Sequence, residues 1–395
     1  MAGPAISCDI AFTTEPAATP TWTAVTNYLE RFAAKRGRTY ETDQFAAGSA
    51  TIVLKNLDRR FDPTYTGGAY GSNVKVGRRI RLRATYSAVT YDLFHGYIDA
   101  YQLVIAPHNG EATAVLTATD AFKVLSRGVV SATYAEAKTE TRIGAILDAI
   151  GWPAGDRTLA TGYARTQATT LASVSALSHL QQVVGDERGA LFIGRDGKVV
   201  FQDRYHRLRP DTPSVMTLGE GGGSERLYAD VDFSFDDGRI VNDARVTRTG
   251  GTEQSDTDST SQTNYYRRAF TAGGLQATDG YAMALAGFMV ERYKQPQIRA
   301  GAIALDPEAD PTAIWPLVLN REIGDRLTVK RTPPGGGGAI SQLGSLEGVD
   351  MAWTARGGIW TRLAWEVSPG TTDTYFVLNH ATYGPLTTGV GRLAP

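Results

Sequence analysis

Alternating apolar and polar residues predict that most of the first third of the chain is β-strand. Residues 5–125 contain short alternating stretches separated by turn-forming clusters, such as DPTYTGGAYGSN at 62–73 and APHNG at 106–110. This pattern is typical of antiparallel strands with one buried face. Residues 26–37 fit a short amphipathic helix as well as a strand by their period. We predict a strand there because the surrounding residues are strand-like.

The pattern changes to a helical period in the middle of the chain. Apolar residues spaced at i, i+3, i+4 and i+7 predict one helix at about 141–150, and a similar apolar face predicts a second at about 175–185. An Asp-Gly dipeptide then lies between two alternating apolar runs, which predicts a β-hairpin over 190–203.

Two further segments belong to the last third of the chain. A helical period over 279–294 stops before Pro296 and predicts a third helix. Residues 250–264, GGTEQSDTDSTSQTN, are polar almost throughout. We expect an exposed loop there, because such a segment has few apolar side chains to bury.

One stretch of the chain occurs twice in related form. VKVGRRIRLRATY at 74–86 matches REIGDRLTVKRTP at 321–333, and FHGYIDAY at 94–101 matches LEGVDMAW at 346–353. A third alternating segment follows in both copies. The repeat predicts two related β units of at least three strands each. The duplicated positions are Gly77, Gly96 and Asp99 in the first copy and Gly324, Gly348 and Asp350 in the second.

These duplicated residues are expected to have structural roles. Asp99 and Asp350 would each hold a turn or a strand end, because repetition in two separate units favours shared structure over shared chemistry.

The patterns together predict a mainly β fold with smaller α+β parts. The expected domains are a first β unit over 1–127, a small α+β domain over 128–225, a second β unit over 226–370 and a C-terminal extension over 371–395. Several domains are expected because a chain of 395 residues is long for a single core.

Composition narrows the classes of function. The chain has 40 Lys plus Arg against 41 Asp plus Glu, a formal net charge of −1. Proteins that grip DNA need surplus cationic side chains to neutralise phosphates, so tight nucleic-acid binding is not expected. The single cysteine, Cys8, excludes an internal disulfide. We expect neither a secretory signal nor a membrane segment, and therefore folding in the cytoplasm.

No residue pattern predicts catalysis, a metal site or a cofactor. The glycine-rich segments 219–225 and 334–338 lack the Lys-Ser/Thr pair of a phosphate-binding loop. The histidines show no pair at metal-ligand spacing. They are His95, His108, His179, His206 and His380. The chain is therefore predicted not to be an enzyme.

One predicted strand carries three arginines on a single face. Arg79, Arg81 and Arg83 alternate with apolar residues, and the second copy retains Arg326 at the first of these positions. Such a face could grip DNA, face solvent or pair with acids of a neighbouring subunit. We favour a solvated or subunit-interface role for Arg79, Arg81, Arg83 and Arg326.

The chain resembles minor tail proteins of long-tailed phages. The matching strings are AGSATIVLKNLDRRFDPTYTGGAYGSNVKVGRRIRLRA (47–84), LFHGYIDAY (93–101) and LTATDAFKVL (116–125). IVNDARVTR (240–248) and YYRRAF (265–270) resemble the later part of baseplate hub proteins. The resemblance spans nearly the whole chain and includes no catalytic motif.

This resemblance implies two tail-tube-like β-barrel domains in each chain of a homotrimer that caps the distal end of the tail tube. Three chains would then present six similar edges to a six-membered ring, which adapts six-fold to three-fold symmetry. The implied partners are the distal tail protein or tube ring, other baseplate or tip proteins and the tape measure protein. DNA is expected to pass through a central channel without specific binding.

The resemblance also implies a location. The protein is expected at the tail tip of the virion after synthesis in the host cytoplasm. No long enzymatic or fibre region is expected after the second barrel.

Three other interpretations stay open. A hexameric distal tail protein has one tube-like barrel, and the second β unit argues against it. A tail-associated cell-wall hydrolase needs catalytic signatures that the sequence lacks. A receptor- or carbohydrate-binding protein would use aromatic residues such as Trp353, Trp360 and Trp365, but strand positions favour packing roles for two of them.

Overall fold

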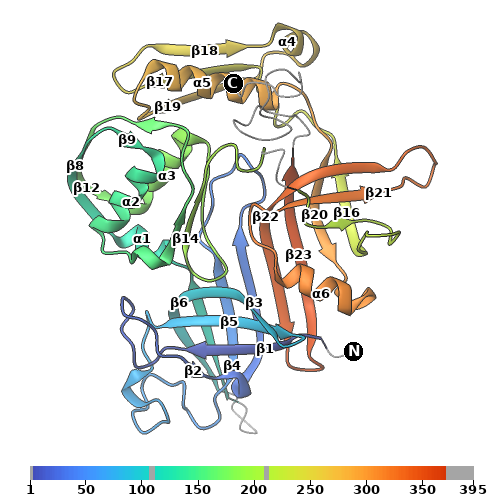
Figure 1. Ribbon diagram of the computed structural model, residues 1–395. Helices are drawn as coiled ribbons and strands as arrows, with labels where there is room; N and C mark the ends of the chain where they lie inside the picture. The colour runs from blue at the N-terminus through green and yellow to red at the C-terminus, as the bar shows by residue number, and fades with distance from the viewer. Residues whose placement is uncertain (1–2, 106–111, 209–212, 371–395) are drawn as a thin grey trace.

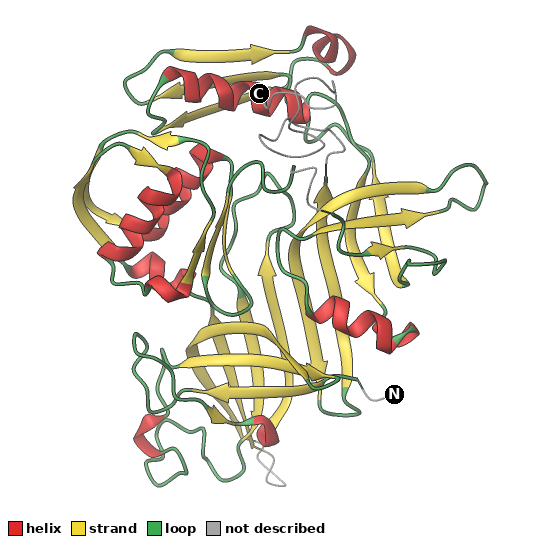
Figure 2. Cartoon of the chain, in the orientation of Figure 1, coloured by secondary structure: helices red, strands yellow, loops and turns green. Residues whose placement is uncertain are grey.

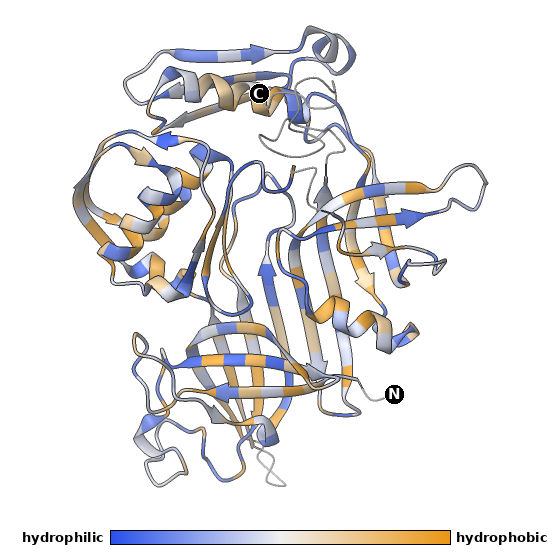
Figure 3. Ribbon diagram, in the orientation of Figure 1, coloured by the Kyte–Doolittle hydropathy of each residue, from blue (hydrophilic) through white to orange (hydrophobic). Residues whose placement is uncertain are grey.

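The computed structural model describes residues 3–105, 112–208 and 213–370 (Figure 1). These residues form one sheet of thirteen strands and four smaller sheets of two or three strands, with six α-helices around them (Figure 2). The predicted mainly β fold with α+β parts is confirmed. Hydrophobic and hydrophilic residues alternate along the strands of the large sheet (Figure 3), as expected for strands with one buried face.

The first β unit contains six main strands. They are β1 (Ala5–Ile10), β3 (Leu29–Gly37), β4 (Ser49–Lys55), β5 (Arg79–Tyr86), β6 (Val89–Ile105) and β7 (Ala112–Thr119). Their order is β3-β4-β7-β6-β5-β1, and every neighbouring pair is antiparallel. The short strand β2 (Thr23–Ala24) pairs with β1 and leads into β3 through the 3₁₀ turn η1 (Thr26–Tyr28). The chain thus leads from β2, beside β1 at one edge of this unit, directly into β3 at the other edge. The strand predicted in 26–37 is confirmed from Leu29 onward.

The second β unit repeats this arrangement. Its strands are β15 (Thr217–Leu218), β16 (Tyr228–Ser234), β20 (Arg299–Leu305), β21 (Arg326–Arg331), β22 (Ile340–Thr354) and β23 (Ile359–Pro369). The order β16-β20-β23-β22-β21-β15 matches the first unit strand for strand. Only the two-residue β15 differs, because it runs parallel to β21. The helix α6 (Pro311–Leu319) lies between β20 and β21 in the chain and buries Trp315 in the shared core.

Backbone hydrogen bonds align the two units residue by residue. The amide of Gly77 donates to the carbonyl of Ile98 at 2.7 Å, and the amide of Gly324 donates to that of Leu346 at 2.8 Å. Both glycines have a positive φ, +82° and +93°, which residues with a side chain rarely adopt. Gly77 therefore corresponds to Gly324, and Ile98 corresponds to Leu346.

A shared β-bulge shows that the sequence alignment of the central strands is wrong. The pairing of β6 with β7 shifts directly after Ile98, and the pairing of β22 with β23 shifts directly after Leu346. The bulged residues are Asp99 and Glu347. Asp99 therefore corresponds to Glu347 and not to Asp350, because an alignment by residue identity misses the true register by several positions.

The counterpart of Gly96 also differs from the predicted Gly348. Gly96 faces Ile80, and Gly344 faces Leu327 at the equivalent position of the second unit. A Cβ atom on Gly96 would lie 2.8 Å from the Thr119 carbonyl oxygen, and one on Gly344 would lie 2.9 Å from that of Ser368. Both glycines thus permit the same close approach to the third strand.

A small α+β domain separates the two units. It contains α1 (Phe122–Arg127), β8 (Val129–Tyr134), β9 (Ala137–Lys138), α2 (Thr139–Ala149), β10 (Arg157–Leu159), β11 (Arg165–Thr166), β12 (Thr169–Ser175), α3 (Ala176–Glu187), β13 (Ala190–Ile193) and β14 (Val199–Gln202). The helices predicted at 141–150 and 175–185 are confirmed as α2 and α3, and the hairpin as β13 and β14.

A second insert interrupts the second unit between β16 and β20. It consists of β17 (Asp243–Arg248), β18 (Glu253–Thr257), α4 (Ser259–Tyr265), β19 (Ala269–Gly274) and α5 (Asp279–Tyr293). The predicted helix at 279–294 is confirmed as α5. The expected loop at 250–264 is wrong, because β18 pairs with β17 and Asp258 caps α4 by accepting the Ser261 amide at 2.8 Å.

The division into domains at residues 127 and 225 stays a prediction. Buried side chains near both boundaries pack on the other side of them. Phe122 and Leu125, before residue 127, pack in the core of the α+β domain, and Leu218, before residue 225, packs in the core that contains the second unit. The predicted turn at 106–110 and the predicted extension at 371–395 lie outside the described residues.

Candidate assembly interface

The His, Cys, Asp and Glu side chains of the described residues do not gather into a metal-binding cluster. No cluster of three or more potential metal ligands occurs within 3–105, 112–208 and 213–370. His179 is 1% exposed, and burial together with the neighbouring Arg142 lowers its pKa to about 4. His179 is therefore uncharged at neutral pH and packs as a core residue. His95 lies 3.1 Å from Asp92 on the same strand.

Two buried aspartates have displaced pKa values but structural partners. Burial raises the pKa of Asp120 and that of Asp186 to about 7. Asp120 accepts the Gly48 amide at 2.6 Å, and Asp186 accepts the Leu275 amide at 2.7 Å. Each carboxyl group thus accepts a hydrogen bond from a backbone amide, which is a structural role.

The candidate aromatic residues pack inside the second unit. Trp365 is 1% exposed, and Trp353 and Trp360 pack against the core with Phe32. The ring of Trp360 also lies 5.4 Å from that of Trp315. These contacts fit packing roles better than a ligand-binding aromatic surface.

The arginine strand has acidic partners within the same unit. Arg81 and Arg83 on β5 both donate to Asp9 of β1, at 2.9 and 2.7 Å. Arg79 donates to the Pro16 carbonyl at 2.9 Å, and Arg326 is buried. The charges of Arg81 and Arg83 are thus largely met within the chain. A subunit contact for this strand stays a prediction.

The two β units are joined edge to edge inside the chain. The second half of β22 pairs antiparallel with β3, from Gly348 opposite Gly37 to Thr354 opposite Arg31. This internal junction makes one continuous sheet of the two units (Figure 1). Its inward-facing side chains are buried, which excludes water from the joint. They include Phe32, Ala34, Val349 and Met351.

Two glycines bring the backbones at one end of the internal junction unusually close. A Cβ atom on Gly37 would lie 2.2 Å from the Glu347 carbonyl oxygen, and one on Gly348 would lie 2.8 Å from the Arg38 carbonyl oxygen. Gly37 also has a φ of +99°. The predicted structural role of Gly348 therefore belongs to the internal junction and not to the repeat.

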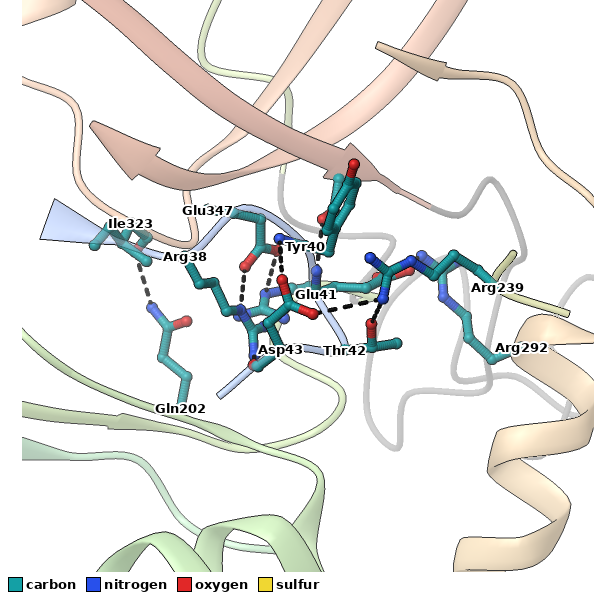
Figure 4. Close-up of polar contacts among 12 residues, drawn as sticks. Arg38, Tyr40, Glu41, Thr42, Asp43, Gln202, Arg239, Arg292, Ile323 and Glu347 are labelled. Carbon is teal, nitrogen blue, oxygen red and sulfur yellow. Dashed lines mark hydrogen bonds and ion pairs between the residues drawn. The ribbon is translucent and has the colours of Figure 1, made fainter. Parts of the chain in front are cut away.

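A buried ion cluster lies directly beside these glycines (Figure 4). The Nε of Arg38 donates to Glu347 at 2.8 Å, and the Nε of Arg207 lies 3.3 Å from the other Glu347 oxygen. Arg38 also donates to the Asp43 carbonyl at 2.6 Å and lies over the ring of Phe45. Glu347 is fully buried, so its charge depends on these two arginines.

The segment that follows β3 connects this cluster to the inserts. Arg292 of α5 donates to Glu41 at 3.1 Å and to the Pro369 carbonyl oxygen. Arg239 donates to Thr42 at 2.6 Å (Figure 4). The segment 38–45 therefore links the first unit, the end of the second unit and the insert between β16 and β20.

A second ion pair joins the two β units beside the internal junction, and the α+β domain contacts it through a backbone amide. Arg36 donates to Glu322 at 2.9 Å, and Glu322 also accepts the Arg195 amide at 2.8 Å. Burial alone would raise the pKa of Glu322, but Arg36 and backbone amides hold that pKa below its ordinary value. Gln202 donates to the Ile323 carbonyl at 3.4 Å nearby.

Arg38, Arg207 and Glu347 belong to no motif that marks them in the sequence as members of one cluster. The available signal was a glutamate between Leu346 and Gly348 in the central strand of the second copy. Its arginine partners lie 309 residues before and 140 residues before it in the chain, so spacing carried no information about the contact.

Sequence comparisons identify no relative of this chain. No family model matches it, and no curated protein matches it. Among the described residues, no helix combines the length and the apolarity that crossing a membrane requires.

Solved structures share the fold. A tail protein from Neisseria meningitidis has a TM-score of 0.57 and 12% identity, covering 93% of this chain and 100% of that chain. A 43 kDa tail protein of prophage MuSo2 from Shewanella oneidensis has a TM-score of 0.54 and 11% identity, covering 93% and 96%. An E. coli component of the type VI secretion system, similar to T4 bacteriophage tail proteins, has a TM-score of 0.50 and 10% identity, covering 87% and 74%.

Proposed function

We propose that this chain is a structural phage tail protein that forms a trimeric baseplate hub at the distal end of the tail tube. The observation that carries this proposal is the duplicated β unit, whose strand order and central bulge are the same in both halves of the chain. The likeness to tail-protein structures supports the same assignment.

The duplication suits a change of symmetry. Six subunits around a tail tube present six equivalent surfaces. Three chains that each contain two similar units present six similar surfaces in return, while the rest of each chain occurs only three times. The internal junction fixes the two units of one chain relative to each other, so half of the contacts in such a ring are already formed within the chains.

The charge distribution suits a passage for DNA. The net charge of −1 gives no overall attraction for phosphate. Arg81 and Arg83 are paired with Asp9, which reduces their availability for contacts with DNA. DNA is therefore expected to pass through the ring without specific binding, and the protein to act without catalysis.

The expected partners follow from this position. The distal tail protein or a tube ring lies on one side of the hub, and other baseplate or tip proteins lie on the other. The tape measure protein is a further candidate inside the tube. A hexameric distal tail protein is the nearest alternative, but one barrel per chain is enough for six-fold symmetry, and this chain has two units.

Mass and location test the proposal together. Native mass spectrometry of the full chain is expected to give a mass of three chains, and labelled antibodies are expected to decorate the tail tip of the virion in electron micrographs. A mass of six chains with the same location would indicate the distal tail protein instead. Clearing of host cell walls by the purified chain would indicate a hydrolase.

A further inference from the structure

Two strand edges of the large sheet have no partner strand among the described residues. The strand β16 pairs only with β20, and the second half of β6, residues 99–105, pairs only with β7. These edges are the counterparts of β3 and of the second half of β22, which pair with each other at the internal junction. The chain therefore contains one formed junction and both halves of a second one.

The register of β16 can be transferred from β3. A bulge follows Leu29 in the pairing of β3 with β4, and an equivalent bulge follows Tyr228 in the pairing of β16 with β20. A second shift between Val231 and Phe233 has its extra residue on β20, so it does not change the count along β16. Leu29 therefore corresponds to Tyr228. By the same count Phe32 corresponds to Val231, and the buried Ala34 corresponds to Phe233.

The register of β6 can be transferred from β22 in the same way. The bulges after Ile98 and Leu346 make Leu103 the counterpart of Met351, and Ile105 the counterpart of Trp353. At the internal junction Met351 faces Ala34, and Trp353 faces Phe32. Applied to the two unpaired edges, the same pairing places Leu103 opposite Phe233 and Ile105 opposite Val231.

Apolar side chains are exposed at both edges. Ile105, the counterpart of the partly buried Trp353, is 70% exposed, and Phe235, directly after β16 at the position of the buried Arg36, is 68% exposed. Leu103, Val231 and Phe233 are only partly buried. An uncovered edge strand with apolar side chains invites pairing with another strand, and soluble proteins normally block or cover such an edge.

We propose, building on the trimeric hub, that β6 of one chain pairs antiparallel with β16 of the next chain in the register of the internal junction. Tyr101 then lies opposite Phe235 and Val104 opposite Asp232, with Leu103 and Phe233 between them. The contact is head-to-tail, because β6 and β16 are different surfaces, so three chains close into a ring with one continuous sheet.

One feature of the internal junction is not repeated. Ala100 and Asp236 occupy the positions of Gly348 and Gly37, so the two backbones cannot approach as closely there. The ladder between chains therefore begins at Tyr101 and ends at Ile105. This pairing is shorter than the pairing of β3 with β22 at the internal junction. A shorter pairing suits a contact that forms only when the chains assemble.

Disulfide crosslinking of the full chain tests this register. The variant Val104→Cys with Asp232→Cys places two thiols opposite each other on the exposed face, where cross-strand Cβ atoms are about 4.5–5.5 Å apart. The control Ala100→Cys with Asp232→Cys shifts one thiol by four residues, about 13 Å along the strand. The native Cys8 is fully buried and does not compete.

Mild oxidation is expected to convert most of the first variant into a covalent trimer and to give at least tenfold less trimer with the control. A native mass of three chains with equal or absent crosslinking in both variants would overturn the edge pairing and leave the hub proposal intact. A disulfide formed within one chain would also overturn it. A native mass of one or six chains would contradict the hub itself.

Discussion

The internal junction and the unpaired edges of β6 and β16 are built from equivalent strands, yet their side chains differ. The internal junction has paired glycines and a fully buried Glu347 between two arginines. At the bulge of β6 the equivalent Asp99 is only half-buried, and it accepts from Thr119 at 2.7 Å and pairs with Lys123. The comparison teaches that duplicated strands can diverge, since one copy of the edge is fixed within the chain by close glycines and buried charges, and the other copy lacks these features.

Replacing Glu347 is expected to have the largest effect. Glu347→Gln removes the carboxylate that lies between the buried guanidinium groups of Arg38 and Arg207, so the free energy of unfolding should fall by about 3–5 kcal/mol. Asp99→Asn at the equivalent bulge is the matched control. It should cost at most about 1 kcal/mol, because its ion pair is partly solvated. Urea denaturation measures both, and equal losses would show that the two bulges do not differ as described.

The ends of the two units are expected to respond differently to pH. Asp120 directly follows β7. When the two units are aligned at their central bulges, Pro369 occupies the equivalent position in the second unit, and its side chain has no titratable group. Burial raises the pKa of Asp120 from 3.8 to about 7, so the folded state holds a proton that the unfolded state releases. This stabilisation is complete below about pH 4 and is lost as the pH rises through 7, by about 2 kcal/mol between pH 5 and 7.

Asp120→Asn tests this pH dependence. Asp186 has a similarly raised pKa of about 7 and keeps its own contribution in the variant. The buried His179, with a pKa lowered to about 4, contributes with the opposite sign and is also unchanged in the variant. The decrease in unfolding free energy between pH 5 and 7 should therefore be about 2 kcal/mol smaller in the variant than in the parent protein, whatever the offset in stability. An unchanged slope would mean that Asp120 is ionised in the folded protein.

A charge at the unpaired edge should weaken assembly without unfolding the chain. Phe233→Lys places an ammonium group where β16 meets β6 of the next chain, and charged residues at such positions block edge pairing. We expect each contact between chains to be at least tenfold weaker, about 1.4 kcal/mol per contact, which analytical ultracentrifugation detects as a loss of trimer. Tyr266→Lys is the control, because Tyr266 is 85% exposed on the insert. Equal weakening by both variants would contradict the edge contact.

The smallest effect is expected on the arginine strand, where the two units are alike. Arg83 pairs with Asp9 at 2.7 Å in the first unit, and Lys330 pairs with Glu225 at 3.0 Å in the second. Both pairs are partly exposed, so Arg83→Gln and Lys330→Gln should each change the free energy of unfolding by less than about 1 kcal/mol. A larger loss of trimer with Arg83→Gln would support the predicted subunit role of this strand.

Local patterns predicted much of the fold. The helical periods identified α2, α3 and α5, and the Asp-Gly turn identified the hairpin of β13 and β14, because these elements depend on neighbours in the chain. The repeat revealed both units through Gly77 and Gly324, whose positive φ restricts the residue type. The predicted register of the central strands was wrong because Gly348 was aligned with Gly96. Gly348 is required for the close approach of the backbones at the internal junction and has no counterpart role in the repeat.

The assembly interface was largely hidden from sequence analysis. The pairing of β3 with β22 joins residues more than 300 positions apart, and neither strand carries a local sign of its partner. The prediction of a loop over the polar segment 250–264 was wrong for a related reason. The strand β18 forms its backbone hydrogen bonds with β17 and exposes its polar side chains. Tertiary pairing overrode composition there.

A density map of the assembled ring at side-chain resolution tests the central claim most directly. The account predicts three chains, six β units around the axis and a sheet that continues from β6 of each chain into β16 of the next, with Leu103 opposite Phe233. A ring of six chains, or three chains that meet through other surfaces and leave both edges bare, would contradict it.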